Sequence, residues 1–490
     1  MRILSPFFIL LITTFFSTSI HAHETIHRTC ASQDIVTQYL LDNYTLEELK
    51  GSVPYTSVSR KGEGDLDYSV PVVNSDSVYT IKVVVHVVYL ADNKYENPSD
   101  ELIQSQIDAL NRDFNLENDI NHVRPEFLQF MGNAKIRFEL AKVQPNGKPT
   151  TGINRKKSAP ILFPDWNPVL DNIKNSGTGG VTPWSPKDYL NIWVCDLNMV
   201  NRLKKNEVEV DRSKGLLGGM ANPPQGLPNW VFNIGGVQQN LAITKEIKQG
   251  VVIDFRFFGQ NPEYVMDYLN GSPNYSLGRT TVHEVGHYLG LRHSWGDGQA
   301  YAELFGGDEC LDYDDGIKDT PSEEGPYSAY AEPGNVCGVN VNSCDVPYPG
   351  DGVDYPDMRE NYMNYSTDAC YGMFTIEQVN MMRYALTAKR PGIITKREVP
   401  IPTSIKNRST LEAMIYPNPS NDIIRINLNS AGRDESRIAI FNTLGQNVKS
   451  QVLSSGIQNT EINIQNLSAG SYIVQIERGS ESITKQLIVQ

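Results

Sequence analysis

The sequence predicts an α/β domain followed by a small all-β sandwich. The chain has 490 residues, which is too long for one ordinary domain. From Val78 onward, β-branched segments alternate with segments of helical periodicity, as in an α/β unit. The last 80 or so residues hold short strands separated by turn residues, which indicates a sandwich.

The α/β unit is predicted from its periodicity. The β-branched run Ile81–Leu90 indicates a buried strand. Apolar residues at helical spacing behind Pro98 and Ser99 predict a helix over about 100–115. Three further strands are expected at 136–140, 190–194 and Val251–Phe258, and a long helix comes after them.

Residues 296–362 are rich in Gly, Pro and Asp and show little periodicity. So long an irregular stretch is usually functional, or clamped by ligands or cross-links. The sandwich strands are expected at Ile423–Leu428, Arg437–Phe441, Gln446–Leu453, Glu461–Ile464, Ser471–Glu477 and Ser482–Val489.

The N-terminus reads as a secretory signal. Arg2 precedes the apolar run Ile3–Phe16, and the small, polar residues Ser17–Ser19 then begin the cleavage region. We expect Ala22 to be the last residue of the signal. The alternative is a membrane anchor, but the run is shorter than the roughly 20 residues that span a bilayer. No later segment is long and apolar enough to span, so we expect no transmembrane segment in the mature protein.

The charge balance excludes some partners. The chain has 43 Lys and Arg against 57 Asp and Glu, a formal net charge of −14. This argues against a nucleic-acid binder, which needs clustered basic residues. The acidity fits calcium, cationic substrates or solubility, and does not choose among them.

The strongest chemical signal is His283–His293, with the pattern H-E-x-x-H-x-x-G-x-x-H. Positions i and i+4 lie about 40° apart around a helix, so His283 and His287 reach one ion. Glu284 lies where it can bond a metal-bound water, and a left-handed Gly290 turns the chain back toward His293. Three histidines plus a water make an open, catalytic zinc site.

The alternative is that these are surface histidines on an amphipathic helix. The chain has only 8 histidines, however, and three of them fall in this segment at ligand spacing. We therefore interpret the segment as the helix of a zinc hydrolase.

The same segment is the metzincin signature. The segment Asn361–Cys370 resembles the methionine turn of the pappalysin family, especially its ulilysin-like bacterial branch, and Arg279–Val282 fits the same group. The resemblance covers about residues 78–390. It implies a metzincin catalytic domain, with a twisted mixed sheet, an active-site helix and a loop-rich C-terminal subdomain.

The resemblance also implies roles for two residues of this turn. Met363 would form the floor beneath the zinc, where the alternative is an ordinary core methionine. Tyr365 would bond the oxyanion of the tetrahedral intermediate, where the alternative is simple packing. Glu284 would accept the water's proton and pass it to the leaving amine.

Asp368 is the candidate for specificity. In ulilysin-like enzymes the aspartate two residues before this cysteine lies at the base of the pocket for the residue after the cut, which favours Arg or Lys there. The alternative is a solvated loop aspartate. With that preference, the enzyme would cut before Arg60 or Lys61 and release its own N-terminal segment.

A calcium site is a further expectation. Asp315, Asp319 and Thr320 belong to a segment crowded with hard oxygen ligands that resembles the family's calcium loop. The alternative is a solvated acidic loop.

The six cysteines are too few for a disulfide scaffold, although an exported protein can hold local staples. Four of them bracket the irregular stretch and permit three pairings. The family pattern implies Cys310–Cys344 and Cys337–Cys370. Cys195 lies on a predicted strand and is most simply a buried free thiol.

Cys30 is the cysteine left over. A lone thiolate in a pro-segment occupies the open zinc position in zymogens that the chain resembles, so Cys30 is the candidate switch. The alternatives are an incidental thiol or a disulfide to Cys195.

The C-terminal module has a separate resemblance. Its segments Tyr416–Pro419, Phe441–Gln446, Leu467–Tyr472 and Lys485–Val489 are similar to the type A sorting domain of type IX secretion. That similarity implies a secretion address through the periplasm to the cell surface or beyond, with no part in catalysis. The competing interpretation is a carbohydrate- or protein-binding sandwich, although no aromatic platform or metal cluster supports it.

These observations together indicate a secreted zinc endopeptidase made as a latent proenzyme. Zinc and calcium are the expected cofactors, and protein or peptide substrates and the type IX machinery are the expected partners. The alternatives are a catalytically silent metzincin-fold adhesin or a narrow processing peptidase. The expected domains are a signal at 1–22, a pro-segment at 23–60, a catalytic domain at 61–390, a linker at 391–412 and the sandwich at 413–490.

Overall fold

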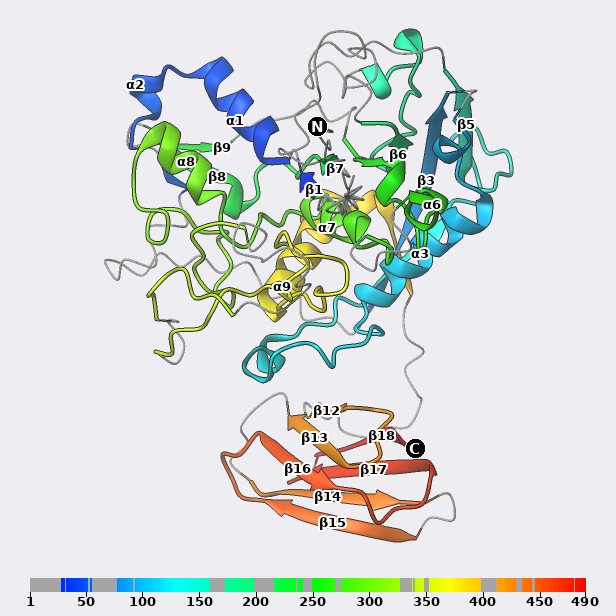
Figure 1. The fold of residues 1–490 in the computed structure, drawn as a ribbon, viewed down its shortest axis with the longest axis vertical. Helices are drawn as coiled ribbons and strands as arrows, with labels where there is room; N and C mark the ends of the chain where they lie inside the picture. The colour runs from blue at the N-terminus through cyan, green and yellow to red at the C-terminus, as the bar shows by residue number, and fades with distance from the viewer. Residues whose placement is uncertain are drawn as a thin grey trace, which may run out of the picture.

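A computed structural model shows an α/β unit at one end of the longest axis and a β-sandwich at the other (Figure 1). The predicted signal, Arg60 and Lys61 lie outside the described residues. The structure describes residues 28–30, 32–51, 53–54, 77–90, 93–158, 172–197, 216–234, 237–240, 249–268, 275–326, 337, 340–347, 352–397, 411, 413–428, 434–442, 446–479 and 481–490.

An eight-stranded mixed sheet forms the centre of the α/β unit. Strands β3, β4, β5, β6 and β10 are joined by parallel pairings, while β7 and β11 pair antiparallel with their neighbours β10 and β3. The predicted metzincin sheet is confirmed. Its order is β1 (Arg28–Cys30), β7 (Leu216–Ala221), β10 (Val251–Asp254), β6 (Leu190–Cys195), β3 (Val78–Tyr89) and β11 (Ile394–Arg397), with β4 (Ile136–Leu140) and β5 (Ile153–Lys157) also paired to β3.

Strand β3 lies in the interior of the sheet, and its valines from Val83 to Val88 are buried on both faces. Helix α3 (Asp100–Asp113) buries Ile103, Ile107 and Leu110 at helical spacing, and the Ser99 hydroxyl accepts a hydrogen bond from the Leu102 amide at its start. The predictions for β3, β4, β6 and α3 therefore agree with the structure to within a few residues.

Two sheet boundaries differ from the sequence analysis. The strand expected over Val251–Phe258 ends at Asp254, because the Asp254 carboxylate accepts from the Arg256 amide and starts a 3-10 helix at Phe255–Phe257. Residues 394–397, which the sequence analysis assigned to the linker, form β11 and pair with β3. The sheet of the α/β unit therefore extends past residue 390.

The active-site helix α7 (Arg279–Tyr288) is buried along its whole length and packs against α3, β7 and β10. Helix α9 (Ile376–Tyr384) begins with a capping box formed by Thr375 and Gln378. The described part of the unit also contains α6 (Glu263–Tyr268) and α8 (Gly298–Phe305), with 3-10 helices at Lys94–Glu96, Pro125–Phe130, Ser176–Thr178, Pro228–Trp230 and Pro391–Ile393 and a π-helical turn at Ala385–Lys389.

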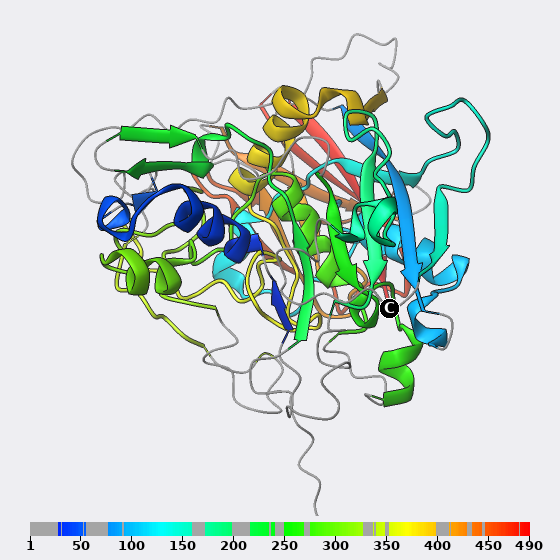
Figure 2. The same ribbon diagram turned by 90° about the horizontal axis from the view of Figure 1, so that it is seen from above.

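The N-terminal segment is part of this unit. After β1 it forms α1 (Ser32–Asn43) and α2 (Leu46–Leu49), close to α8 and to the hairpin β8 (Val231–Ile234) and β9 (Val237–Asn240) (Figure 2). Strand β2 (Val53–Pro54) pairs with β8. The N-terminal segment therefore reaches the unit through two short helices and one added strand.

The C-terminal domain is the predicted sandwich of two antiparallel sheets. Ile438, Ile440, Val474 and Ile476 alternate along two paired strands of one sheet and belong to the core of the sandwich. Met414 and Tyr416 pack against an apolar cluster of the α/β unit. The strands are β12 (Ala413–Tyr416), β13 (Ile423–Leu428) and β16 (Asn459–Asn463) in one sheet, and β15 (Asn447–Leu453), β14 (Ser436–Phe441), β17 (Gly470–Arg478) and β18 (Glu481–Val489) in the other.

Among the described residues, no helix has the length and apolarity that crossing a membrane requires.

Candidate active site

Three histidines converge on one point at the C-terminal half of α7. The Nε2 atom of His287 lies 3.1 Å from the Nε2 atoms of both His283 and His293. Gly290 makes the return of the chain possible, because its φ of 99° is in the region that side chains disfavour and a Cβ there would meet Leu227 at 2.2 Å. The expected ligand spacing is thus realised in three dimensions.

The hydrogen bonds of the three rings leave their Nε2 atoms available for a metal. The Nδ1 atoms of His283 and His287 bond the carbonyls of Tyr362 at 2.7 Å and Leu291 at 2.9 Å, and the Nδ1 atom of His293 bonds the carboxylate of Asp297. Such partners fix the tautomer with its proton on Nδ1. Burial lowers the pKa of His287 to about 3, so its ring is neutral. This donor set fits zinc.

Two residues beside His293 were missed by the sequence analysis. Asp297, which is 2% exposed, holds the ring through Nδ1. Trp295 stacks on the His293 ring with centroids 4.3 Å apart and meets the Tyr365 ring edge-on at 4.8 Å. Asp297 could have been predicted from the sequence, because it is a carboxylate four residues after the third histidine. Nothing in the sequence indicates the stacking of Trp295 on His293.

Glu284 lies beside the three histidines and is 1% exposed. Strand β7 approaches it closely at Gly219, where a Cβ would come within 2.7 Å of the Glu284 Cγ. A glycine at this position therefore leaves room for the Glu284 side chain.

Cys30 enters this group from the N-terminal segment. Its Sγ belongs, with the three histidines, to a buried set of ligand atoms that all lie within 4.8 Å of one another. The thiol donates to Glu284 Oε2 at 3.3 Å, and burial followed by the charge of Glu284 raises its pKa. Cys30 and Cys195 are both free and buried, so the alternative of a disulfide between them is wrong.

The backbone and a neighbouring side chain of Cys30 also engage the site. Tyr365 Oη accepts from the Cys30 amide at 2.8 Å and donates to the Cys30 carbonyl at 3.0 Å. Ser32, which the sequence analysis missed, donates to Glu284 Oε2 at 3.4 Å. The segment therefore covers the histidines, the carboxylate and the tyrosine together.

Met363 lies directly beneath α7 and is fully buried. A Cβ on Gly286 would lie 2.4 Å from the Met363 Sδ, so this glycine permits the close approach. The Met363 carbonyl accepts from the Ser294 amide at 3.3 Å, which links the turn to the loop of His293.

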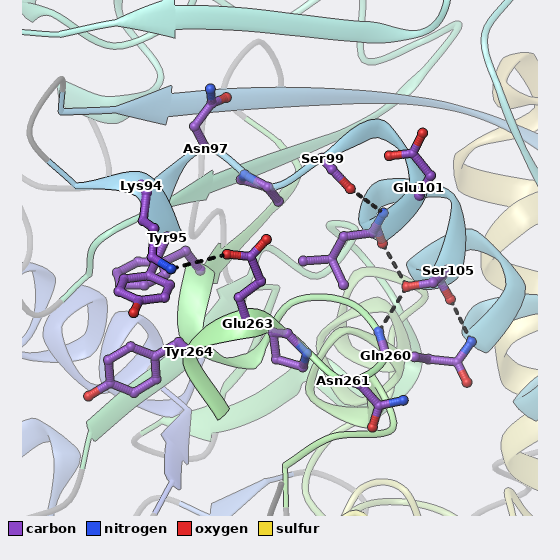
Figure 3. A pocket seen from close by; sticks show the side chains of 14 residues that line it. Lys94, Tyr95, Asn97, Ser99, Glu101, Ser105, Gln260, Asn261, Glu263 and Tyr264 are labelled. Carbon is purple, nitrogen blue, oxygen red and sulfur yellow. Dashed lines mark hydrogen bonds and ion pairs between the residues drawn. The ribbon is translucent and has the colours of Figure 1, made fainter. Parts of the chain in front are cut away.

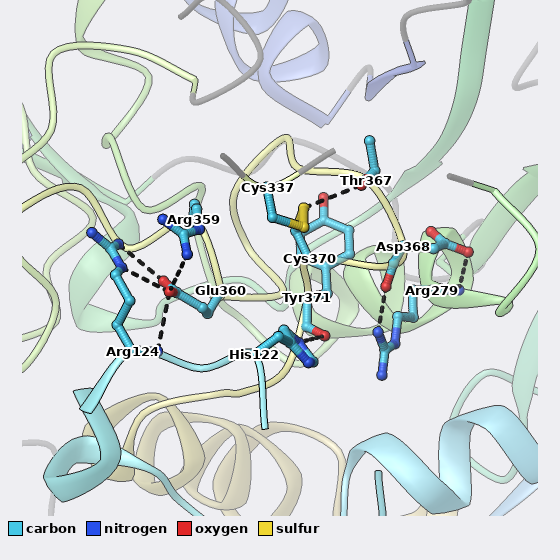
Figure 4. Close-up of a disulfide and its surroundings, with 10 residues drawn as sticks. All are labelled: His122, Arg124, Arg279, Cys337, Arg359, Glu360, Thr367, Asp368, Cys370 and Tyr371. Atoms are coloured by element: carbon cyan, nitrogen blue, oxygen red, sulfur yellow. Dashed lines mark hydrogen bonds and ion pairs between the residues drawn. A yellow bond between two sulfur atoms is a disulfide. The ribbon is translucent and has the colours of Figure 1, made fainter. Parts of the chain in front are cut away.

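Asp368 lies at the start of α7, beside the disulfide Cys337–Cys370 (Figure 4). Its Oδ2 accepts from the amides of Leu277 at 2.9 Å and Arg279 at 3.4 Å, and the side chain is 1% exposed. The Arg279 guanidinium donates to the Asp368 carbonyl. Asp368 is therefore a buried carboxylate, and a solvated loop position is excluded.

The second disulfide joins Cys310 to Cys344. These two pairs are those that the resemblance implied. One disulfide closes a loop within the irregular stretch, and the other joins that stretch to the methionine turn.

The expected calcium ligands hydrogen-bond different partners. Asp315 Oδ1 accepts from the Thr320 hydroxyl at 2.9 Å, whereas Asp319 Oδ2 accepts from the Glu377 amide at the start of α9. Burial raises the pKa of Asp319 to about 7. Calcium binding by this loop stays a prediction.

A cavity of about 300 Å³ lies elsewhere in the unit, between the start of α3 and α6 (Figure 3). Tyr95, Ser99, Gln260 and Tyr264 line it, and Lys94 pairs with Glu263 across it at 3.8 Å. None of the histidines, Glu284 or Tyr365 lines this cavity.

Comparison with known proteins identifies two matched regions. Residues 259–387 match the family model described as pregnancy-associated plasma protein-A, a peptidase family. Residues 414–490 match the model of the secretion system C-terminal sorting domain.

Individual relatives agree with these matches. A promirolysin mutant of Tannerella forsythia is 32% identical, with a TM-score of 0.51, over 75% of this chain and 95% of that one. An extracellular metalloprotease of Colletotrichum graminicola is 39% identical over 23% of this chain and 31% of its own length. One from Coccidioides posadasii is 37% identical over 23% and 32%. The chain thus spans about a third of the length of these two curated relatives.

Proposed function

Because the chain belongs to the pappalysin family of metalloproteases, we propose that it is a secreted zinc-dependent endopeptidase made as a latent proenzyme. The proposal depends mainly on one observation: Cys30 lies against the three histidines, Glu284 and Tyr365 at the same time. A segment that covers every reacting group of a hydrolytic site is what latency requires.

The chain's own groups then have defined tasks. A zinc ion held by His283, His287 and His293 would supply a Lewis acid that lowers the pKa of a water and polarises the scissile carbonyl. Glu284 accepts the proton of the attacking water and delivers it to the leaving amine. The Tyr365 hydroxyl, once released from Cys30, donates to the oxyanion.

Latency follows from the same contacts. Cys30 Sγ would supply a fourth ligand to a zinc held by the histidines, its backbone bonds the Tyr365 hydroxyl, and Ser32 bonds Glu284. Removal of the segment before Arg60 or Lys61 would free all three groups, and these basic residues suit self-processing if Asp368 selects Arg or Lys after the cut.

The preference for Arg or Lys is the finer part of the proposal. Asp368 is buried, as a selecting carboxylate should be, although the Leu277 and Arg279 amides already bond one of its oxygens. We expect Asp368→Ala to lose discrimination between Lys and Leu after the cut by about tenfold or more. A variant that keeps its preference in a peptide library would exclude the pocket assignment.

The C-terminal sandwich gives the chain its export route. Its match to a secretion sorting domain supports delivery by the type IX machinery to the cell surface or outside. The buried residues of the sandwich are mostly aliphatic, and none of the proposed catalytic side chains lies in it.

One assay tests the activity. The processed chain should cleave peptides, and a zinc chelator or Glu284→Ala should abolish cleavage. The loss for Glu284→Ala should be at least about 10²–10⁴-fold, because the general base is removed. A wild-type chain that cleaves nothing in a broad peptide library after removal of the pro-segment would overturn the proposal.

A further inference from the structure

A buried carboxylate outside the zinc group joins the two segments that carry the reacting residues. Glu323 is 1% exposed, and its Oε2 accepts from the Ser294 hydroxyl at 3.0 Å and from Asn364 Nδ2 at 2.6 Å. Its Oε1 accepts from the Met358 amide at 2.8 Å. Three chain segments therefore meet at one side chain.

The positions of these partners matter because each adjoins a residue of the site. Ser294 follows His293 directly, and Asn364 lies between Met363 and Tyr365. Asn364 also donates to the Ser294 hydroxyl at 3.0 Å, and its Oδ1 accepts from the Tyr365 amide at 2.7 Å. A shift of Glu323 would thus move the third histidine relative to the tyrosine.

We propose that Glu323 is a positioning residue that holds the loop of His293 against the turn that carries Tyr365. This inference rests on the proposed function for its effect on turnover, but not for its effect on metal binding. Glu323 touches neither the histidines nor Glu284 and acts only through Ser294, Asn364 and Met358.

The central test compares Glu323→Ala with Glu324→Ala in the processed chain. Glu324 is the adjacent residue and is exposed, so it is a matched control. Loss of an orienting carboxylate should lower kcat about tenfold or more, with little change in KM, because His293 and Tyr365 act in the transition state. The control should match the wild type.

Zinc affinity, measured by competition with a chromogenic chelator, gives a readout that does not need activity. Glu323→Ala should bind zinc more weakly, since His293 is less well held, and Ser294→Ala should have a smaller effect. The double variant Glu323→Ala/Ser294→Ala should lose less zinc-binding free energy than the sum of the losses in the two single variants. Wild-type kcat and zinc affinity in Glu323→Ala would overturn the proposal, whereas an inactive wild type with weakened zinc binding in the variant would count against the proposed function alone.

The dependence of stability on pH can show whether Glu323 acts through its ionisable carboxyl group or only through its volume. Burial, and then the charge of Asp357, raises the pKa of Glu323 to about 8 from an ordinary 4.5, while Arg124, itself paired with Glu360 at 2.8 Å, lowers it. The native state thus keeps a proton that the unfolded chain releases. The stabilisation is full below about pH 4.5 and is lost as the pH rises through about 8.

Glu323→Gln removes this titration but keeps the shape. The melting temperature of the wild type, measured relative to that of Glu323→Gln, should therefore fall between about pH 5 and about pH 9. A flat profile for Glu323→Gln would show that burial does not hold a proton on Glu323; together with wild-type kcat and zinc affinity in Glu323→Ala, it would overturn the proposal.

Discussion

The two ends of the N-terminal segment hold the catalytic unit by different physics. At the near end, Cys30 and Ser32 are held by polar contacts with Glu284 and Tyr365. At the far end, α1 and α2 bury aliphatic side chains at 0% exposure in the main hydrophobic core. One end covers the reacting groups, and the other end supplies most of the binding energy.

This difference separates inhibition from attachment. Polar contacts to catalytic groups block chemistry but add only about 1 kcal/mol each. Each buried aliphatic side chain adds about 1.5–3 kcal/mol. Variants at the near end should therefore release activity without releasing the segment, while variants at the far end should release the segment itself.

The largest effect is expected at the far end. Leu49 is fully buried and Leu46, on the same helix, is 59% exposed. Leu49→Ala should weaken attachment of the segment by about 2–5 kcal/mol, whereas Leu46→Ala should cost little. Both are measured by gel filtration of Glu284→Ala chains cut at a protease site inserted after residue 61, and equal release of the segment by the two variants would contradict the comparison.

At the near end, Cys30→Ala should raise the activity of the uncut chain by about tenfold or more, equivalent to about 1.4 kcal/mol of lost inhibition. Cys195→Ala removes the other buried free thiol and is the control. Initial rates on a quenched peptide measure the effect. If the Cys30→Ala chain stays as latent as the control, Cys30 is not the switch.

Ser32→Ala should have a smaller effect of the same kind. The hydroxyl donates to Glu284 Oε2 and accepts from the Ala221 amide at 3.1 Å, so its loss removes about 1 kcal/mol of contact. We expect about a fivefold rise in the activity of the uncut chain, with the segment still attached after cutting. Release of the segment by this variant would show that the two ends are not separate.

The smallest effect is expected from removal of the metal. A chelator should take zinc from the cut Glu284→Ala chain and yet leave the segment bound, because Val36, Leu40 and Leu49 do not depend on the metal. The bound fraction should change by less than about twofold in gel filtration. Complete dissociation of the segment after zinc removal would show that the segment is held mainly through Cys30 and the metal.

The sequence predicted the parts of the site that are local along the chain. His283, Glu284 and His287 follow from helical spacing, and Gly290 with His293 follows from turn chemistry. Residues that act across the fold could not be found in this way. The backbone of Cys30 bonds Tyr365 over a separation of 335 residues, and nothing in the neighbourhood of either residue reports that contact.

The fold shows the same division. Strands rich in β-branched residues were predicted, but β7 was missed because its run Leu216–Ala221 contains two glycines, which are poor strand formers. Gly219 is there because Glu284 needs the space, a tertiary reason. Strand β11 was assigned to the linker because prolines such as Pro391 mix there with basic residues such as Lys396 and Arg397, and only its pairing with β3 shows its place.

The pairing of β11 with β3 has a consequence for folding. Ile394 pairs with Ile81, so the sheet of the catalytic unit closes over more than 300 residues of intervening chain. Contacts of such long range form slowly. All strand pairings of the sandwich lie within residues 413–490. We therefore expect the sandwich to fold before the catalytic sheet closes, even though the ribosome makes it after the catalytic unit.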